Sequence, residues 1–197
     1  MLLVGMMNPK QRWRHSLDLR HLTWPTNGWG YLPPIKDVFE MFEYIEGFCQ
    51  PRSILEIGYH AGHSTTYMLE TFPNSHVTTY GVSKPAHATY GSMMDHYTGR
   101  LNIILEKSET LALDFSTYDF AFVDGNHTYE GARHDILLCV ERHIPYILID
   151  NVESKGVAKA REDVYRDTSY KKIHLVEYFS SWNNVIQWNT MELWANV

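Results

Sequence analysis

Two apolar runs in this 197-residue chain end in side chains that carry oxygen. The stretch PYILIDNV, residues 145–152, finishes in Asp150 and Asn151, and the stretch FAFV, residues 120–123, is followed by Asp124. If the two runs are neighbouring strands, they lie about 4.8 Å apart and their carboxylates meet at one edge of a sheet. Two such carboxylates repel, and a hard cation with oxygen ligands removes the conflict. The pattern predicts an Mg²⁺ site at Asp124, Asp150 and Asn151. Asp-Gly and Asp-Asn are also common turn pairs, so a purely structural role stays open.

His127 follows Asp124 by three positions and is expected at the same edge of the sheet. The pKa of an imidazole is close to working pH, so His127 is a candidate general base. The chain has eleven histidines, so the position of His127 rather than its type carries this interpretation, and hydrogen bonding at a helix start is the alternative. His60 and His63 form an H-x-x-H pair without a Cys or a third His beside them, so we expect no zinc site there.

A glycine-containing loop follows the first predicted strand, in the stretch EIGYHAGHS at residues 56–64. Gly58 and Gly62 let the backbone turn tightly and approach a ligand. The helix that follows offers free N–H groups to a carboxylate or a phosphate. An ordinary strand-to-helix turn explains the same glycines equally well.

Strand-like and helix-like segments alternate along the chain. Apolar residues recur at helical spacing over 35–48, and the predicted strands are SILEI (53–57), HVTTYGV (76–82), LNIILE (101–106), DFAFVD (119–124) and YILID (146–150). Helical patterns occupy 63–72, 86–97, 108–113, 128–143 and 156–167. Strands that are apolar on both faces and joined by helices indicate a parallel sheet with helices on both sides. The predicted fold class is therefore doubly wound α/β.

The C-terminal part departs from this alternation. The runs KKIHLVEYF (171–179) and VIQWNTMELW (185–194) are predicted to form a hairpin around the turn SSWNN. No long Gly, Ser or Pro linker divides the chain, so we expect a single domain over 35–197. Residues 1–34 are expected to form an N-terminal arm, which either closes over an acceptor as a lid or packs on the sheet edge.

Composition excludes several classes of protein. A formal net charge of −6 argues against a nucleic-acid partner, because phosphate neutralisation needs clustered Lys and Arg. The chain has only Cys49 and Cys139, in no CxxC pair, which suits a reducing compartment. The opening MLLVGMM is too short for a signal peptide, and no apolar run approaches the length of a membrane span. We therefore expect a cytoplasmic protein with no membrane partner.

Taken together, these residues resemble the class I S-adenosylmethionine-dependent methyltransferases. More narrowly, the chain resembles the cation-dependent O-methyltransferases of the catechol O-methyltransferase type, and VDGNHTYEGARHDI, residues 123–136, is similar to sugar and macrolide O-methyltransferases. The similarity covers approximately residues 53–157. It implies a Rossmann-like fold with a mostly parallel seven-stranded sheet and an antiparallel C-terminal strand. It also implies an S-adenosylmethionine-dependent enzyme, assisted by a divalent cation, that methylates a hydroxyl of a small molecule.

The resemblance assigns a role to each matching residue. Ser64 would meet the cofactor carboxylate, Ser108 would lie beside the adenine, and His127 falls where the catechol-type enzymes carry a lysine base. The implied catalytic residues are His127 and Asp124, and the implied metal ligands are Asp124, Asp150 and Asn151. The implied cofactor-binding residues are Glu56, Gly58, His60, Gly62, Ser64, Ser83, Ser108 and Asp124.

The chain departs from the family at two places. The family ends its second strand with an acidic residue that binds both ribose hydroxyls, whereas this chain has Ser83, which bonds more weakly. Gly125 and Asn126 replace the bulkier residues that flank the adenosyl group in catechol-type enzymes.

Other functions remain open at this point. A glycine loop after the first strand and the pair Ser83-Lys84 also suit an NADP-type oxidoreductase, although the spacing is not G-x-G-x-x-G. A metal-free methyltransferase and a catalytically inactive cofactor-binding scaffold are further alternatives. The acceptor cannot be identified from these residues, and Trp188 and Trp194 are candidates for a homodimer edge.

Overall fold

The computed structural model describes residue 19 and residues 36–113, 117–182 and 185–197. Nearly all of the predicted N-terminal arm, with Trp24, Trp29 and Tyr31, therefore lies outside the described residues. The described part of the chain contains no helix long and apolar enough to cross a membrane.

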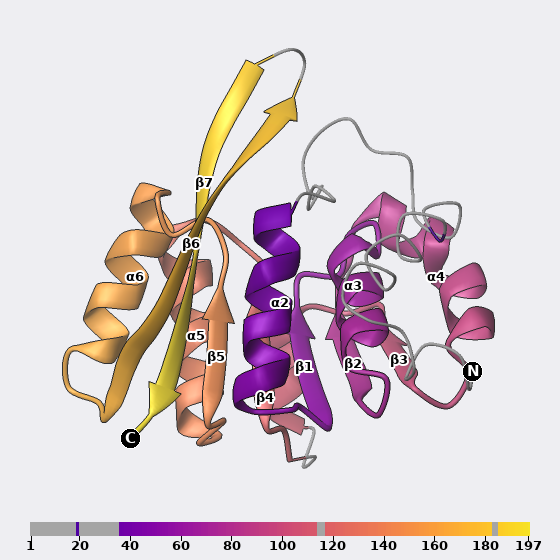
Figure 1. Cartoon of the computed structure of the whole chain (residues 1–197), viewed down its shortest axis with the longest axis horizontal. Helices are drawn as coiled ribbons and strands as arrows, with labels where there is room; N and C mark the ends of the chain where they lie inside the picture. The colour runs from indigo at the N-terminus through magenta and orange to yellow at the C-terminus, as the bar shows by residue number, and fades with distance from the viewer. Residues whose placement is uncertain (1–18, 20–35, 114–116, 183–184) are drawn as a thin grey trace.

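A seven-stranded sheet with the strand order β3-β2-β1-β4-β5-β7-β6 forms the centre of the molecule (Figure 1). Its strands are β1 (Ser53–Ile57), β2 (His76–Tyr80), β3 (Leu101–Ile104), β4 (Phe120–Val123), β5 (Tyr146–Ile149), β6 (Tyr170–Trp182) and β7 (Val185–Asn196). The first five are parallel, β7 runs antiparallel to β5, and β6 runs antiparallel to β7. The doubly wound α/β fold with an antiparallel C-terminal strand is confirmed.

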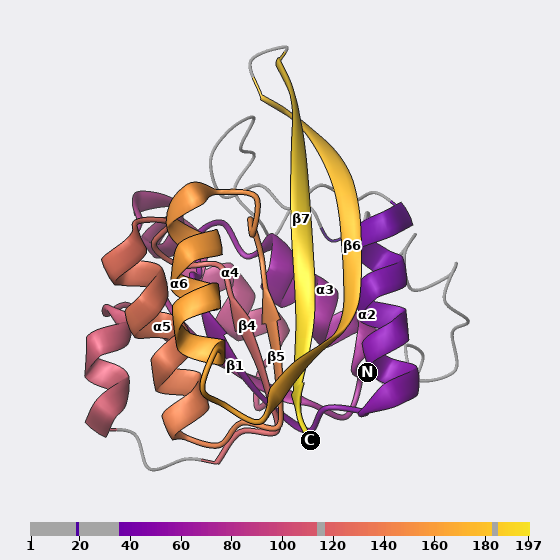
Figure 2. The same cartoon turned by 90° about the vertical axis from the view of Figure 1, so that its left-hand side faces the viewer.

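Helices cover both faces of the sheet (Figure 2). They are α2 (Lys36–Phe48), α3 (His63–Thr71), α4 (Lys84–His96), α5 (Tyr129–Glu141) and α6 (Lys155–Tyr165), with a 3₁₀ turn η3 (Ser108–Leu113). Figure 2 shows α5 and α6 on one face and α2 on the other. The predicted elements agree with these, except that strands two to five end one or two residues earlier and the hairpin strands are longer.

Alternation along each strand divides the core into two layers. In β4, Phe120 and Phe122 pack with α2 and α3, whereas Ala121 and Val123 pack with α5 and α6. Because both faces of the strand are buried, the polar groups that matter for chemistry appear only where the strand ends. The fold therefore gathers the strand tips at one rim.

The hairpin of β6 and β7 extends past the rest of the sheet above this rim (Figures 1 and 2). Phe179 and Trp188 are register partners on it, and both are exposed. Trp194 is only partly exposed, because its ring stacks on Tyr165 at 4.2 Å. Of the two tryptophans predicted for a dimer edge, Trp188 is thus the strongly exposed one.

Candidate active site

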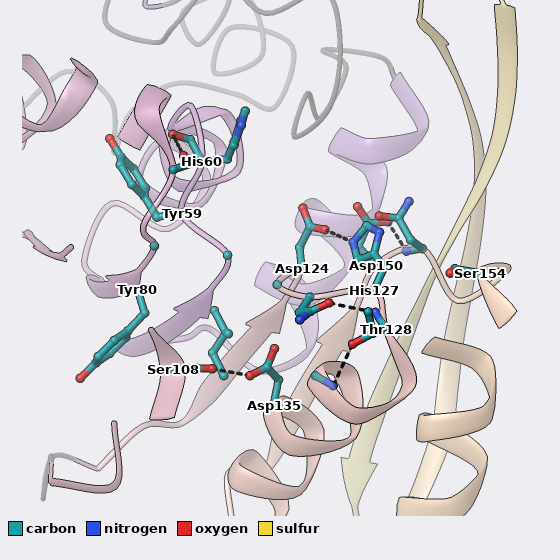
Figure 3. A pocket seen from close by; sticks show the side chains of 18 of the residues that line it. Tyr59, His60, Tyr80, Ser108, Asp124, His127, Thr128, Asp135, Asp150 and Ser154 are labelled. Atoms are coloured by element: carbon teal, nitrogen blue, oxygen red, sulfur yellow. Dashed lines mark hydrogen bonds and ion pairs between the residues drawn. The ribbon is translucent and has the colours of Figure 1, made fainter. Parts of the chain in front are cut away.

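A pocket of about 1300 Å³ opens at the carboxyl ends of the parallel strands. Figure 3 shows Tyr80, Ser108 and Asp135 at one end of it and Asp124, His127 and Asp150 at the other. Ligands of doubly wound sheets bind at this rim. The predicted site residues that line the pocket are Gly58, His60, Ser83, Ser108, Asp124, His127, Asp150 and Asn151.

The loop after β1 forms one wall of the pocket and requires glycine. Gly58 has a φ of 121°, and a Cβ there would lie 1.9 Å from the backbone oxygen of Asp124. Gly62 has a φ of 86° and precedes α3 as its N-cap. The loops after β1 and β4 therefore touch backbone to backbone, which only a residue without a side chain permits at Gly58.

Glu56, Gly62 and Ser64 do not line the pocket. The carboxylate of Glu56 is fully buried and accepts hydrogen bonds from the Ser64 hydroxyl and, at 2.5 Å, from the Thr65 hydroxyl. Burial raises the pKa of Glu56, and these hydroxyls oppose that rise. In the structure, Glu56 and Ser64 thus join β1 to the first turn of α3 beneath the glycine loop.

Ser83 lines the pocket, and its hydroxyl is hydrogen-bonded to backbone groups. Its hydroxyl accepts from the backbone N–H of Ala86 at 3.1 Å, as the N-cap of α4, and it faces the backbone oxygen of His60 at 3.4 Å. This cap explains why a serine suits the position.

Ser108 meets a carboxylate that the sequence did not single out. Its hydroxyl donates to Oδ1 of Asp135 on α5 at 2.6 Å. Asp135 is 3% exposed, and burial raises its pKa. A Cβ on Gly125 would lie 2.6 Å from Oδ2 of Asp135, so the glycine that departs from the catechol-type pattern leaves room for this side chain. The available signal was a carboxylate on the buried face of a predicted helix, beside Ala132 and Ile136.

The other end of the pocket is acidic. The tips of β4 and β5 are adjacent, with Val123 in register with Ile149, and Asp124 and Asp150 follow them. Burial and the neighbouring charge of Asp124 raise the pKa of Asp150 well above its usual value. Nε2 of His127 lies 3.2 Å from Oδ1 of Asp124, and this hydrogen bond raises the pKa of His127. The structure thus brings together the four residues predicted for this end.

The hairpin supplies two partners that the sequence did not reveal. The hydroxyl of Tyr178 donates to Oδ1 and Oδ2 of Asp150, at 2.9 and 3.0 Å. Nδ2 of Asn151 donates to Oδ1 of Asn189 at 3.2 Å, which leaves the Asn151 oxygen for another partner. Both contacts depend on β7 lying beside β5, a pairing between segments that are far apart in the sequence.

The donor set at this end suits a hard cation. Asp124, Asp150 and Asn151 offer only oxygen, and no Lys or Arg of the described ranges forms an ion pair with either carboxylate. A cation would therefore relieve the repulsion between the two carboxylates, which His127 and Tyr178 offset only in part. No group of three or more His, Cys, Asp and Glu side chains in the described residues is arranged to hold a metal. The candidate set differs because its third member is an amide.

Residues 55–151 match the model of a family described as a methyltransferase domain. Over these residues the chain is similar to methyltransferase domains. The match covers the strands β1 to β5 and ends at Asn151, so it includes both acidic tips. A comparison with curated proteins by sequence gives no match.

Solved structures share the fold of this chain. The O-methyltransferase of Bacillus cereus, in complex with SAH, has a TM-score of 0.66 and 13% identity, over 93% of this chain and 90% of that one. TomG of Streptomyces achromogenes, an O-methyltransferase involved in tomaymycin synthesis and solved with SAM, has a TM-score of 0.62 and 13% identity, over 95% and 90%. PH1948 of Pyrococcus horikoshii, assigned as an RNA methyltransferase, has a TM-score of 0.69 and 11% identity, over 96% and 98%.

Replacing Tyr178 with Phe is expected to lower the free energy of unfolding by about 1.5–3 kcal/mol. The change removes the hydroxyl that donates to both oxygens of the buried Asp150. The measurement is urea unfolding followed by circular dichroism. Tyr165→Phe is the matched control, because the Tyr165 hydroxyl is buried without a hydrogen-bond partner among the described residues, and its removal should leave the free energy of unfolding unchanged or raise it. Equal losses in the two variants would show that the bond to Asp150 contributes nothing specific.

Proposed function

We propose that this domain transfers the methyl group of S-adenosylmethionine to a hydroxyl group of a small molecule, with the help of a divalent cation. The observation that carries the proposal is a shared pocket, whose wall includes the glycine loop, Ser108 and the Asp124–His127 pair. A methyl donor bound at the glycine loop and Ser108 would present its methyl group toward the Asp124–His127 pair. The SAH and SAM complexes of the O-methyltransferases from Bacillus cereus and Streptomyces achromogenes support the choice of cofactor.

The cofactor would lie along the tips of β1, β2 and β4. The backbone at Gly58 and His60 offers a close approach for the methionine part, and Ser108 would lie beside the adenine. When bound, S-adenosylmethionine supplies an electrophilic methyl carbon on a sulfonium. Holding an acceptor oxygen in line with that carbon accounts for much of the expected rate, because the two reactants no longer have to meet from solution.

His127 would act as the general base. One ring nitrogen bonds Asp124, which fixes the plane of the imidazole, and the other nitrogen takes the hydroxyl proton. The cofactor would then supply the methyl group to the acceptor oxygen, and the electron pair of the carbon–sulfur bond would remain on its sulfur. The side chain of His127 is 33% exposed, so an acceptor can reach it.

Asp124, Asp150 and Asn151 would hold the cation. A bound cation would lower the pKa of an acceptor hydroxyl that coordinates it. Tyr178 and Asn189 keep Asp150 and Asn151 oriented from the far side, and this arrangement reduces the cost of ordering the ligands.

The decisive experiment combines binding with turnover. Calorimetric titration should show binding of S-adenosylhomocysteine and no binding of NADPH. Methyl transfer from S-adenosylmethionine, assayed against catechols, sugars and nucleosides, should fall after EDTA treatment and return with Mg²⁺. Binding of NADPH alone would overturn the proposal, and transfer that is unaffected by EDTA would remove the cation from it.

A further inference from the structure

The tip of β2 lacks the carboxylate that a nucleoside ligand needs. In doubly wound folds, an acidic residue after the second strand bonds the ribose hydroxyls. Here the strand ends at Tyr80 and continues as Gly81, Val82 and Ser83, none of which is acidic. The Ser83 hydroxyl already caps α4. A ribose bound at this end of the pocket would therefore have no strong acceptor on β2 for its two hydroxyl donors.

The neighbouring strand brings a carboxylate to the same place. β2 and β3 are parallel, with Tyr80 in register with Ile104, and the backbone N–H of Gly81 donates to the oxygen of Ile104 at 3.1 Å. Val82 comes two residues after Tyr80, and Glu106 comes two residues after Ile104. Both residues line the pocket. Glu106 thus follows the strand next to β2 and lines the same pocket as residues 81–83, where the acidic residue is missing.

Glu106 is also free to bind. Its side chain is exposed, and it makes no hydrogen bond or ion pair with any residue that the structure describes. Asp135, another carboxylate near this end of the pocket, is buried and holds Ser108. Glu109 belongs to the first turn of η3, beyond Ser108, and has no register partner on β2.

We infer that Glu106 holds the ribose of the cofactor, as an acceptor for its 2′ and 3′ hydroxyls, from the tip of β3 instead of β2. The inference rests on the proposed function, since it requires a nucleoside cofactor in this pocket. A carboxylate has two oxygens and accepts from two adjacent hydroxyls at once, which an amide or a serine cannot match. Specificity for a ribose over a deoxyribose then comes from this one side chain.

The test is calorimetric titration of Glu106→Gln with S-adenosylhomocysteine and with its 2′,3′-dideoxyribose analogue. We expect the variant to bind S-adenosylhomocysteine about 10- to 100-fold more weakly than the unchanged protein does, because the hydrogen bonds lose their charged acceptor. Both proteins should bind the analogue with about equal affinity. Glu109→Gln is the matched control, since it removes one charge from the same pocket wall, and its affinity for S-adenosylhomocysteine should stay within about twofold.

Two results would overturn the inference while leaving the proposed function intact. One is an unchanged affinity of Glu106→Gln for S-adenosylhomocysteine, and the other is an equal loss for both ligands. A failure of the unchanged protein to bind S-adenosylhomocysteine would instead reject the proposed function, and the inference with it. Glu106 is exposed and makes no bond within the described chain, so a folding defect is not expected, and an unchanged thermal midpoint checks this.

Discussion

Replacing His127 with Ala is expected to lower kcat for methyl transfer by about a hundred- to ten-thousand-fold, the usual contribution of a general base. The imidazole is held by Asp124 at 3.2 Å and is accessible from the pocket. His127 stabilises the transition state and not the bound cofactor, so the affinity for S-adenosylhomocysteine should change by less than about threefold. Single-turnover transfer and calorimetric titration measure the two quantities separately.

His87→Ala is the control for this result. His87 is exposed on α4 and does not line the pocket, so its removal should leave kcat unchanged. If His127→Ala transferred the methyl group as fast as the unchanged protein, another group would have to be the base. The role of His127 would then be rejected, and the proposed binding of S-adenosylmethionine would stand. A parallel loss of cofactor affinity would mean that His127 shapes the pocket rather than moving a proton.

The edge where the strands end could be predicted from the sequence because burial imposes a simple rule on parallel strands. Both faces of β4 and β5 are covered by helices, so their residues must be apolar until the chain leaves the sheet. The first polar residues, Asp124 and Asp150, therefore mark the rim. Predicting that Asp124 and Asp150 lie close together also required the assumption that β4 and β5 are neighbours. The structure shows these two strands paired in parallel.

Contacts that depend on tertiary pairing could not be predicted in the same way. Tyr178 looks like any aromatic residue of a strand, and its bond to Asp150 exists because the C-terminal hairpin returns to β5. Asp135 was hidden for a different reason, because a charged residue within a helix is normally assigned to the exposed face. The expected contact of Ser64 with the cofactor stays a prediction, and the structure adds a hydrogen bond from its hydroxyl to Glu56 that the sequence did not reveal.

Replacing Gly58 with Ala is expected to cost about 2–4 kcal/mol of unfolding free energy and to weaken S-adenosylhomocysteine binding by more than tenfold. A φ of 121° is strained for any residue with a side chain, and the new Cβ would meet the backbone oxygen of Asp124 at 1.9 Å. The neighbour is backbone, so it cannot rotate away, and the loops after β1 and β4 must separate. Urea unfolding and calorimetric titration measure the two effects.

Gly91→Ala tests whether the cost of Gly58→Ala comes from contact or from a general effect of replacing glycine. Gly91 lies within α4, and a Cβ added there would meet nothing within 4 Å in the described part of the chain. Alanine at this position should therefore stabilise the domain by about 0.5–1 kcal/mol through helix propensity. Opposite signs for the two variants would mean that the glycine wall is a steric requirement of the pocket. If Gly58→Ala unfolded at the same urea concentration as the unchanged protein, the two loops could not be in contact, and Asp124 would no longer be tied to the place where the methyl donor is proposed to bind.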